Sequence, residues 1–218
     1  MTATATDPTV LSPAAALSPA VSRRVFRAVL DALARPGEPA RLPVPAAEPP
    51  RSGSPSDAMS SATQPPAVLV PILALADLGT GIHVLDRLEA PTSWADALAT
   101  ATSAPVVPLE RARLVGALRP VTPAEVGALC RGSALAPEEA ALLAVPVADL
   151  AGGPVRWVLS GPGVPGRAAI APSGVPAGFL AARAAAVHRY PTGIDVLLVA
   201  PDGRLLGLPR GTRVEEEN

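Results

Sequence analysis

Proline most restricts what this chain can fold into, because each proline fixes a backbone angle and removes an N–H donor. The sequence has 28 prolines among 218 residues, more than twice the usual fraction of about 5%. Proline and glycine together (28 and 18 residues) make up about a fifth of the chain, below the roughly 25–30% of low-complexity sequences. Hydrophobic residues make up 49% and charged residues 17%. The sequence therefore predicts a globular chain whose length fits one domain.

Every one of the 18 basic residues is an arginine, and lysine is absent. A Schiff base with pyridoxal phosphate or with a carbonyl substrate requires a lysine side chain, and so does a Walker-type phosphate loop. These mechanisms are excluded for this chain. The net charge of −1 and the pI of about 6.1 predict neither a nucleic-acid partner nor an anionic membrane surface.

A single cysteine, Cys130, is present, which excludes an intrachain disulfide and a thiolate zinc cluster. The longest apolar run, residues 67–76, is too short to span a bilayer and contains Pro71. We therefore expect a cytoplasmic protein without a transmembrane segment.

Two arginines followed by apolar residues, at 22–26, look like a twin-arginine export signal. Such a signal continues with an uninterrupted apolar stretch, whereas Arg27, Asp31 and Arg35 interrupt this one. A helix capped by Ser18 and ended by 35–37 explains the segment better. Its apolar stripe is predicted to comprise Val21, Val25 and Val29, widened by Phe26, Leu30 and Leu33.

Helix and strand signals alternate along the rest of the chain. Further helices are expected at 70–76, 92–102, 122–131 and 176–188, the third beginning with a capping box and ending at Gly132. Strands are expected at 82–85, 141–150, 155–160, 194–200 and 204–209, while 113–118 fits either state. Turn signals at 151–154 and 201–203 predict two hairpins. The expected fold is a single α/β domain with a mixed central β-sheet flanked by helices.

Domain boundaries follow from composition. Residues 1–17 are predicted to be a flexible leader to a domain at 18–216. Within that domain, the Pro/Ser-rich segment 45–66 is predicted to be a mobile loop.

The segment 161–166 matches the GxGxxG pattern of dinucleotide-binding loops and follows an apolar strand. That loop binds phosphate with backbone N–H groups and opens directly into a helix. Here Pro162 and Pro165 have no N–H, and 167–172 looks extended. A tight turn is the better interpretation.

Metal ligands and nucleophiles are scarce. His83 and His188 lie over a hundred residues apart in the sequence, unlike the closely spaced ligands of zinc sites. Ser160 is not in a nucleophile elbow, and Cys130 is predicted to be a buried helical thiol. We therefore expect no metal site, no cofactor and no catalytic residue.

The segment 210–213 follows the last predicted strand and contains two arginines, a hydroxyl and free N–H groups. A guanidinium group can bind two oxygens of one phosphate at the same time, so this segment is a candidate anion-binding site. A solvated C-terminal tail is the alternative.

Several segments, taken in order, are similar to a known family. They are RVFR at 24–27 with LARPG at 33–37, LALAD at 73–77, APV at 104–106, ALCRGS at 128–133 with APE at 136–138, LSGPG at 159–163, and PTGID at 191–195 leading to LPRGTRVE at 208–215. This ordered set resembles the family of the H subunit (PhnH) of the bacterial carbon–phosphorus lyase system, over about residues 18–216.

The resemblance implies an α/β fold similar to the large domain of pyridoxal-phosphate-dependent transferases, without the cofactor. It also implies a role in phosphonate catabolism within a core complex that includes the G, I and J subunits. With these partners the subunit helps to form a ribose 1-phosphonate 5-triphosphate from a nucleoside triphosphate and a phosphonate. The resemblance further implies that the iron–sulfur J subunit cleaves the carbon–phosphorus bond later and that the H protein can form homodimers.

On this resemblance we expect a subunit that is not catalytic alone. Arg210 and Thr212 are the candidate anion-binding residues, with Asp195 as an orienting carboxylate and Arg35 as a further candidate. Subunit packing and turn formation are the alternative roles for these four residues. A stand-alone anion-binding or phosphate-binding α/β enzyme is the alternative function.

Overall fold

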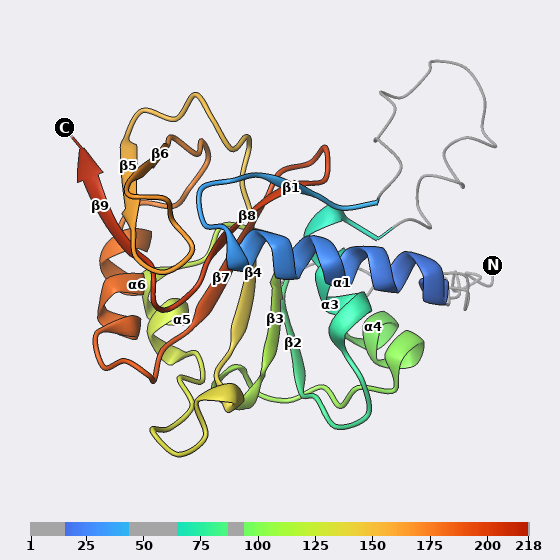
Figure 1. Cartoon of the computed structure of the whole chain (residues 1–218). Helices are drawn as coiled ribbons and strands as arrows, with labels where there is room; N and C mark the ends of the chain where they lie inside the picture. The colour runs from blue at the N-terminus through green and yellow to red at the C-terminus, as the bar shows by residue number, and fades with distance from the viewer. Residues whose placement is uncertain (1–15, 44–64, 87–93, 218) are drawn as a thin grey trace, which may run out of the picture.

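The computed structural model describes residues 16–43, 65–86 and 94–217, which fold around a six-stranded mixed sheet (Figure 1). Its strands, in spatial order, are β1 (Ala40–Arg41), β8 (Arg204–Leu208), β7 (Asp195–Val199), β4 (Leu142–Pro146), β3 (Leu114–Ala117) and β2 (Ile82–Leu85). Strands β2, β3, β4 and β7 are parallel, whereas β8 runs antiparallel to both β7 and β1. The predicted α/β class with a mixed sheet is confirmed.

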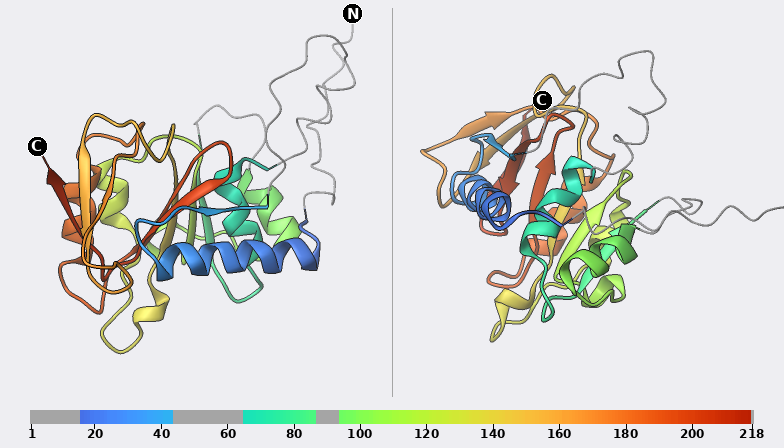
Figure 2. Two further views of the ribbon diagram at one scale, coloured as in Figure 1. Left: turned by 45° about the horizontal axis from the view of Figure 1, so that its top comes forward. Right: turned by 90° about the vertical axis from the view of Figure 1, so that its right-hand side faces the viewer.

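Helices cover both faces of this sheet, because its central strands are apolar on both sides. Along β7, Val196 and Leu198 pack into one core while Leu197 and Val199 pack into the other. The first core is covered by α5 (Pro123–Ala128) and α6 (Phe179–Val187), and the second by α1 (Pro19–Ala34), α3 (Val70–Leu75) and α4 (Trp94–Thr102). Figure 2 shows α1 running along one face of the sheet.

Helix α1 begins where its sequence predicts. The Ser18 hydroxyl accepts a hydrogen bond from the Val21 N–H at 3.3 Å, and Pro19 occupies the first turn. The buried face consists of Val25, Ala28, Val29 and Ala32. The prediction that Phe26 and Leu30 widen this face is wrong, since they are 46% and 49% exposed.

The narrow buried face of α1 results from its close approach to β8. A Cβ atom on Gly207 would collide with the carbonyl oxygen of Ala32, so the helix backbone lies directly on the strand. With the helix this close to the sheet, only small and β-branched side chains fit beneath it, and the larger ones on its flank remain outside.

The predicted hairpin between the strands on either side of 151–154 is wrong. Strand β5 (Arg156–Ser160) belongs to a second, three-stranded sheet, between β6 (Ala168–Ile170) and β9 (Arg213–Glu217). After β4 the chain leaves the first sheet, as the Ala148 N–H bonds to Ser173 O and the Gly153 N–H to Ala171 O. Figure 1 shows β5 and β9 beside each other, away from β2.

Helix α5 has its predicted capping box, in which Thr122 and Glu125 bond to each other's backbone. Hydrogen bonds from Arg119 and Thr122 lower the pKa of Glu125 to about 2. The helix ends at Ala128, because Leu129 is extended, so the prediction that it reaches 131 and stops at Gly132 is wrong. Helix α6 likewise begins at Phe179 rather than at residue 176.

Other predicted elements are confirmed. These are β2, β6, α3 with Pro71 in its first turn, and the β7–β8 hairpin, and residues 113–118 resolve as strand β3. Three short 3-10 helices complete the described elements, at Ala67–Leu69, Leu109–Arg111 and Pro137–Glu139. The start of the helix predicted from residue 92 lies outside the described residues, as do nearly all of the predicted leader and the 45–66 loop. Among the helices of the described ranges, none has the length and apolar character that a membrane crossing requires.

The contact between α1 and β8 gives a testable prediction. Gly207→Ala places a methyl group against the Ala32 carbonyl, so we expect the free energy of unfolding to fall by about 1–3 kcal/mol. Gly127→Ala is the matched control, because the space around Gly127 in α5 is open and alanine favours helix by up to about 1 kcal/mol. Urea unfolding measures both, and equal midpoints would contradict the close approach.

Candidate functional site

Three of the four predicted site residues lie together, and the fourth lies elsewhere. Asp195 is the first residue of β7, and Arg210 and Thr212 belong to the turn at 209–212 that follows β8, which we call the terminal turn. Arg35 is the C-terminal cap of α1.

Asp195 and Arg210 form a closely paired contact that is mostly buried, with side chains 23% and 15% exposed. Arg210 Nη2 lies 2.6 Å from Asp195 Oδ2, and Arg210 Nε lies 3.2 Å from Oδ1. The backbone N–H of Arg210 donates to the same carboxylate at 2.8 Å, while Nη1 donates to the Pro137 carbonyl at 2.6 Å and to that of Pro191 at 3.3 Å. All three guanidinium nitrogens of Arg210 therefore bond to protein oxygens.

A second arginine, which was not among the predicted site residues, binds the carbonyl groups of the terminal turn. Arg183 of α6 is 2% exposed, and its Nη2 donates to the carbonyls of Pro209 at 2.7 Å and Thr212 at 3.1 Å. Burial lowers the pKa of Arg183 to about 10, against the opposing effect of the Asp195 charge. An arginine within an alanine-rich helix was the signal available in the sequence.

The Thr212 side chain is also enclosed, at 2% exposure. Its backbone N–H donates to Pro209 O at 2.9 Å, and its hydroxyl has no hydrogen-bond partner in the described part of the chain. In this arrangement Asp195, Arg210, Arg183 and Thr212 fix the terminal turn, which matches turn formation, the alternative role given for the predicted residues. Anion binding by Arg210 and Thr212 stays a prediction.

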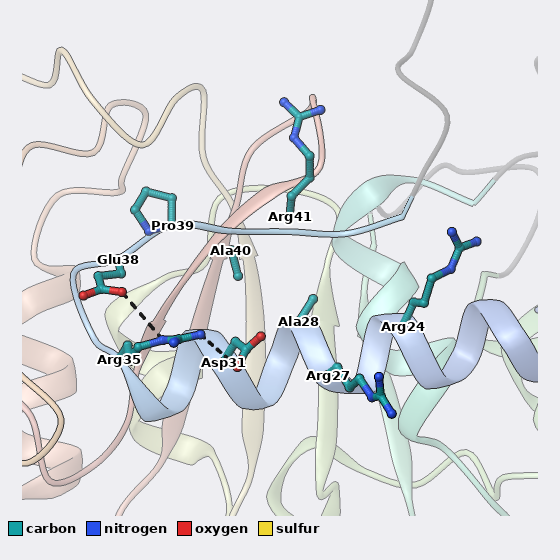
Figure 3. A pocket seen from close by; sticks show the side chains of 9 residues that line it. All are labelled: Arg24, Arg27, Ala28, Asp31, Arg35, Glu38, Pro39, Ala40 and Arg41. Carbon is teal, nitrogen blue, oxygen red and sulfur yellow. Dashed lines mark ion pairs between the residues drawn. The ribbon is translucent and has the colours of Figure 1, made fainter.

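Arg35 lies in a groove between α1 and the segment 38–41, which we call the arginine groove (Figure 3). The groove encloses about 350 Å³ and is lined by Arg24, Arg27, Arg35 and Arg41, the carboxylates Asp31 and Glu38, and Ala28, Pro39 and Ala40. Cations therefore outnumber carboxylates among its lining residues.

The four arginines of the groove differ in whether they form ion pairs. Arg35 contacts Asp31 at 2.9 Å and Glu38 at 3.6 Å, and Arg41 lies 3.8 Å from Asp202. Arg24 and Arg27 make no ion pair with any residue that the structure describes. Because an unpaired guanidinium can bind a phosphate or phosphonate oxygen in bidentate fashion, this groove is the better candidate anion site.

The remaining motifs have structural explanations. Residues 161–166 form the turn between β5 and β6, with the Val164 N–H bonded to Gly161 O at 3.1 Å, so the predicted tight turn is confirmed. His83 lies on β2 with Nδ1 2.9 Å from Val107 O. Cys130 is half-buried and outside any helix, its Sγ 3.3 Å from Glu139 O, which corrects its predicted helical position.

The Asp195–Arg210 contact gives a second prediction. Asp195→Asn leaves Arg210 enclosed without its carboxylate, so we expect a loss of about 2–3 kcal/mol in the free energy of unfolding, less than for a fully buried pair. Asp31→Asn is the matched control, because its pair with Arg35 is more than half exposed and should change stability by less than about 1 kcal/mol. Thermal unfolding of both variants tests this, and equal losses would contradict the structural role.

Comparison with known proteins agrees with the resemblance noted in the sequence. The family model described as "Bacterial phosphonate metabolism protein (PhnH)" matches residues 14–215. A curated protein of Rhizobium meliloti (strain 1021), alpha-D-ribose 1-methylphosphonate 5-triphosphate synthase subunit PhnH, is 31% identical over 200 residues, which cover 90% of this chain and 91% of that protein. The chain therefore belongs to the PhnH family of bacterial phosphonate metabolism proteins.

Proposed function

We propose that this chain is the PhnH subunit of a synthase that forms ribose 1-phosphonate 5-triphosphate from a nucleoside triphosphate and a phosphonate during phosphonate catabolism. The observation that carries the proposal is the family match over residues 14–215. The Rhizobium meliloti relative, named as a subunit of such a synthase, is covered over 91% of its length. Both chains therefore share nearly their whole length rather than one motif.

A role within a complex is supported by the scarcity of metal-ligating and acid–base side chains in the described ranges. In the described ranges, no three His, Cys, Asp or Glu side chains are close enough together to hold a metal ion. The ring nitrogens Nδ1 of His83 and His188 both lie within hydrogen-bond distance of backbone carbonyls. We infer that the chain acts with the G, I and J subunits of the carbon–phosphorus lyase core complex, in the cytoplasm, and is not catalytic alone. Homodimer formation and likeness to the large domain of pyridoxal-phosphate-dependent transferases belong to the same proposal.

The arginine groove is the part of this surface best suited to the anions of the proposed reaction. A nucleoside triphosphate, a phosphonate and the ribose triphosphate product all carry oxygens that guanidinium groups bind. Arg24 and Arg27 form no ion pair with a described residue. The groove would then form one wall of a shared site, whereas a stand-alone anion-binding enzyme, the alternative function, would use it unaided.

Co-purification tests the proposed function. When the chain is expressed with tagged G, I and J subunits from the same genome, we expect it to be retained at a fixed ratio after a wash at physiological salt. The same lysate with untagged subunits is the control. A chain that is absent from the retained complex would contradict the proposal.

Binding of inorganic triphosphate tests the groove. We expect calorimetry at low salt to detect saturable binding that weakens at least tenfold in the double variant R24Q/R27Q, because each lost charged contact removes about 1.5–3 kcal/mol. Arg111→Gln, at an exposed position outside the groove, is the matched control and should bind as the wild type does. Equal binding by all three proteins would exclude the groove, and turnover of a phosphonate by the isolated chain would favour the stand-alone enzyme.

A further inference from the structure

Helix α1 exposes two large apolar side chains that are not packed in either core of the chain. Phe26 is 46% exposed and Leu30 is 49% exposed. At 100° per residue, positions 26 and 30 are neighbours one turn apart on the same flank of the helix. Leu33, which continues this flank, is partly buried against the second core. The two side chains therefore form a short apolar strip rather than two scattered exposures.

Arginines line this strip. Residues 23 and 27 occupy the row next to 26 and 30 on the helix surface, and Arg24 stands one row further, at the arginine groove. Arg23, Arg24 and Arg27 form no ion pair with a described residue, whereas Asp31, one turn further on, is bonded to Arg35. We call the surface formed by Arg23, Phe26, Arg27 and Leu30 the outer face of α1; Arg27 lies at its border and also lines the arginine groove.

An apolar centre beside unpaired cations has the composition of a protein interface, in which aromatic residues and arginine are enriched. The phosphate and phosphonate groups of small ligands would use the arginines but would cover neither Phe26 nor Leu30. A second copy of this chain would bring the same three unpaired cations to the contact, and like charges at a contact lower affinity. A partner protein whose surface carries carboxylates around an apolar patch would contact both the exposed apolar side chains and the unpaired arginines.

We propose that the outer face of α1 is a docking surface for another protein subunit, and that the partner presents an apolar patch bordered by Asp or Glu side chains. This inference rests on the proposed function, because it assumes a complex in which the chain is a subunit. It adds where the contact is made and which chemistry the partner must have. The apolar strip would supply affinity, and the arginines would supply orientation and association rate.

The test compares two double variants in the co-purification with tagged G, I and J subunits. F26S/L30S removes the apolar strip, and L78S/L135S is the matched control, since Leu78 and Leu135 are 79% and 98% exposed outside α1. We expect the control to be retained as the wild type is, and F26S/L30S to bind at least tenfold more weakly. Thermal unfolding of both purified variants, expected to match the wild type, verifies that each is folded.

Arg23→Glu tests the charge requirement without altering the strip. We expect at least tenfold weaker retention that worsens as the salt concentration falls, because the reversed charge then repels the partner's carboxylates without screening. Retention of Arg23→Glu equal to that of the wild type would overturn the acidic chemistry assigned to the partner.

The outcomes separate this inference from the proposed function. If the wild type is not retained, the proposed function is overturned and the docking surface with it. If the wild type and F26S/L30S are retained equally, the docking surface alone is overturned. If light scattering instead shows that F26S/L30S abolishes self-association of the purified chain while retention is unchanged, a second copy occupies the face and the acidic partner is rejected.

Discussion

The C-terminal third of the fold depends on the contacts by which Asp195 and Arg183 fix the terminal turn, residues 209–212. Asp195 binds the guanidinium and the backbone N–H of Arg210, while Arg183 binds the turn's carbonyls from α6. Residues 209–212 connect β8 of the first sheet to β9 of the second. The turn must therefore keep one direction for β9 to pair with β5 over five residue pairs. Asp195 from β7 and Arg183 from α6 fix that direction together with the turn's own hydrogen bond from the Thr212 N–H to Pro209 O.

The close packing of α1 on β8 determines which side chains of α1 remain exposed at the candidate sites. Because the helix backbone lies on Gly207, its buried face is limited to one narrow side. Three sides are then presented around one helix: a buried side, a side facing the arginine groove and the outer face, with Arg27 at the border of the last two. The 3.6-residue period distributes arginines to the last two sides from a single cluster at 23–27.

Local signals in the sequence were sufficient for some elements and insufficient for others. Ser18 with Pro19, the capping box at Thr122, and the 201–203 turn each act within a few residues, so the starts of α1 and α5 and the β7–β8 hairpin were predicted correctly. The failed hairpin after β4 and the unforeseen strand β9 depend on partners far along the chain, and periodicity says nothing about which strands pair. The close contact with Gly207, which leaves Phe26 and Leu30 outside, is also non-local.

For the candidate sites too, some features could be predicted from the local sequence and others could not. Asp195 and Arg210 lie fifteen residues apart across a predicted hairpin, so their proximity could be expected, but their enclosure could not. Arg183 is placed by carbonyls more than twenty residues away, and the arginine groove exists only because the segment 38–41 folds back along α1. A chain without lysine places every side-chain cation on a guanidinium, which keeps its charge across the physiological range. The charge presented by the arginines of the groove is therefore constant near neutral pH, and in the proposed site a change in pH in that range would act on the phosphate or phosphonate rather than on the arginines.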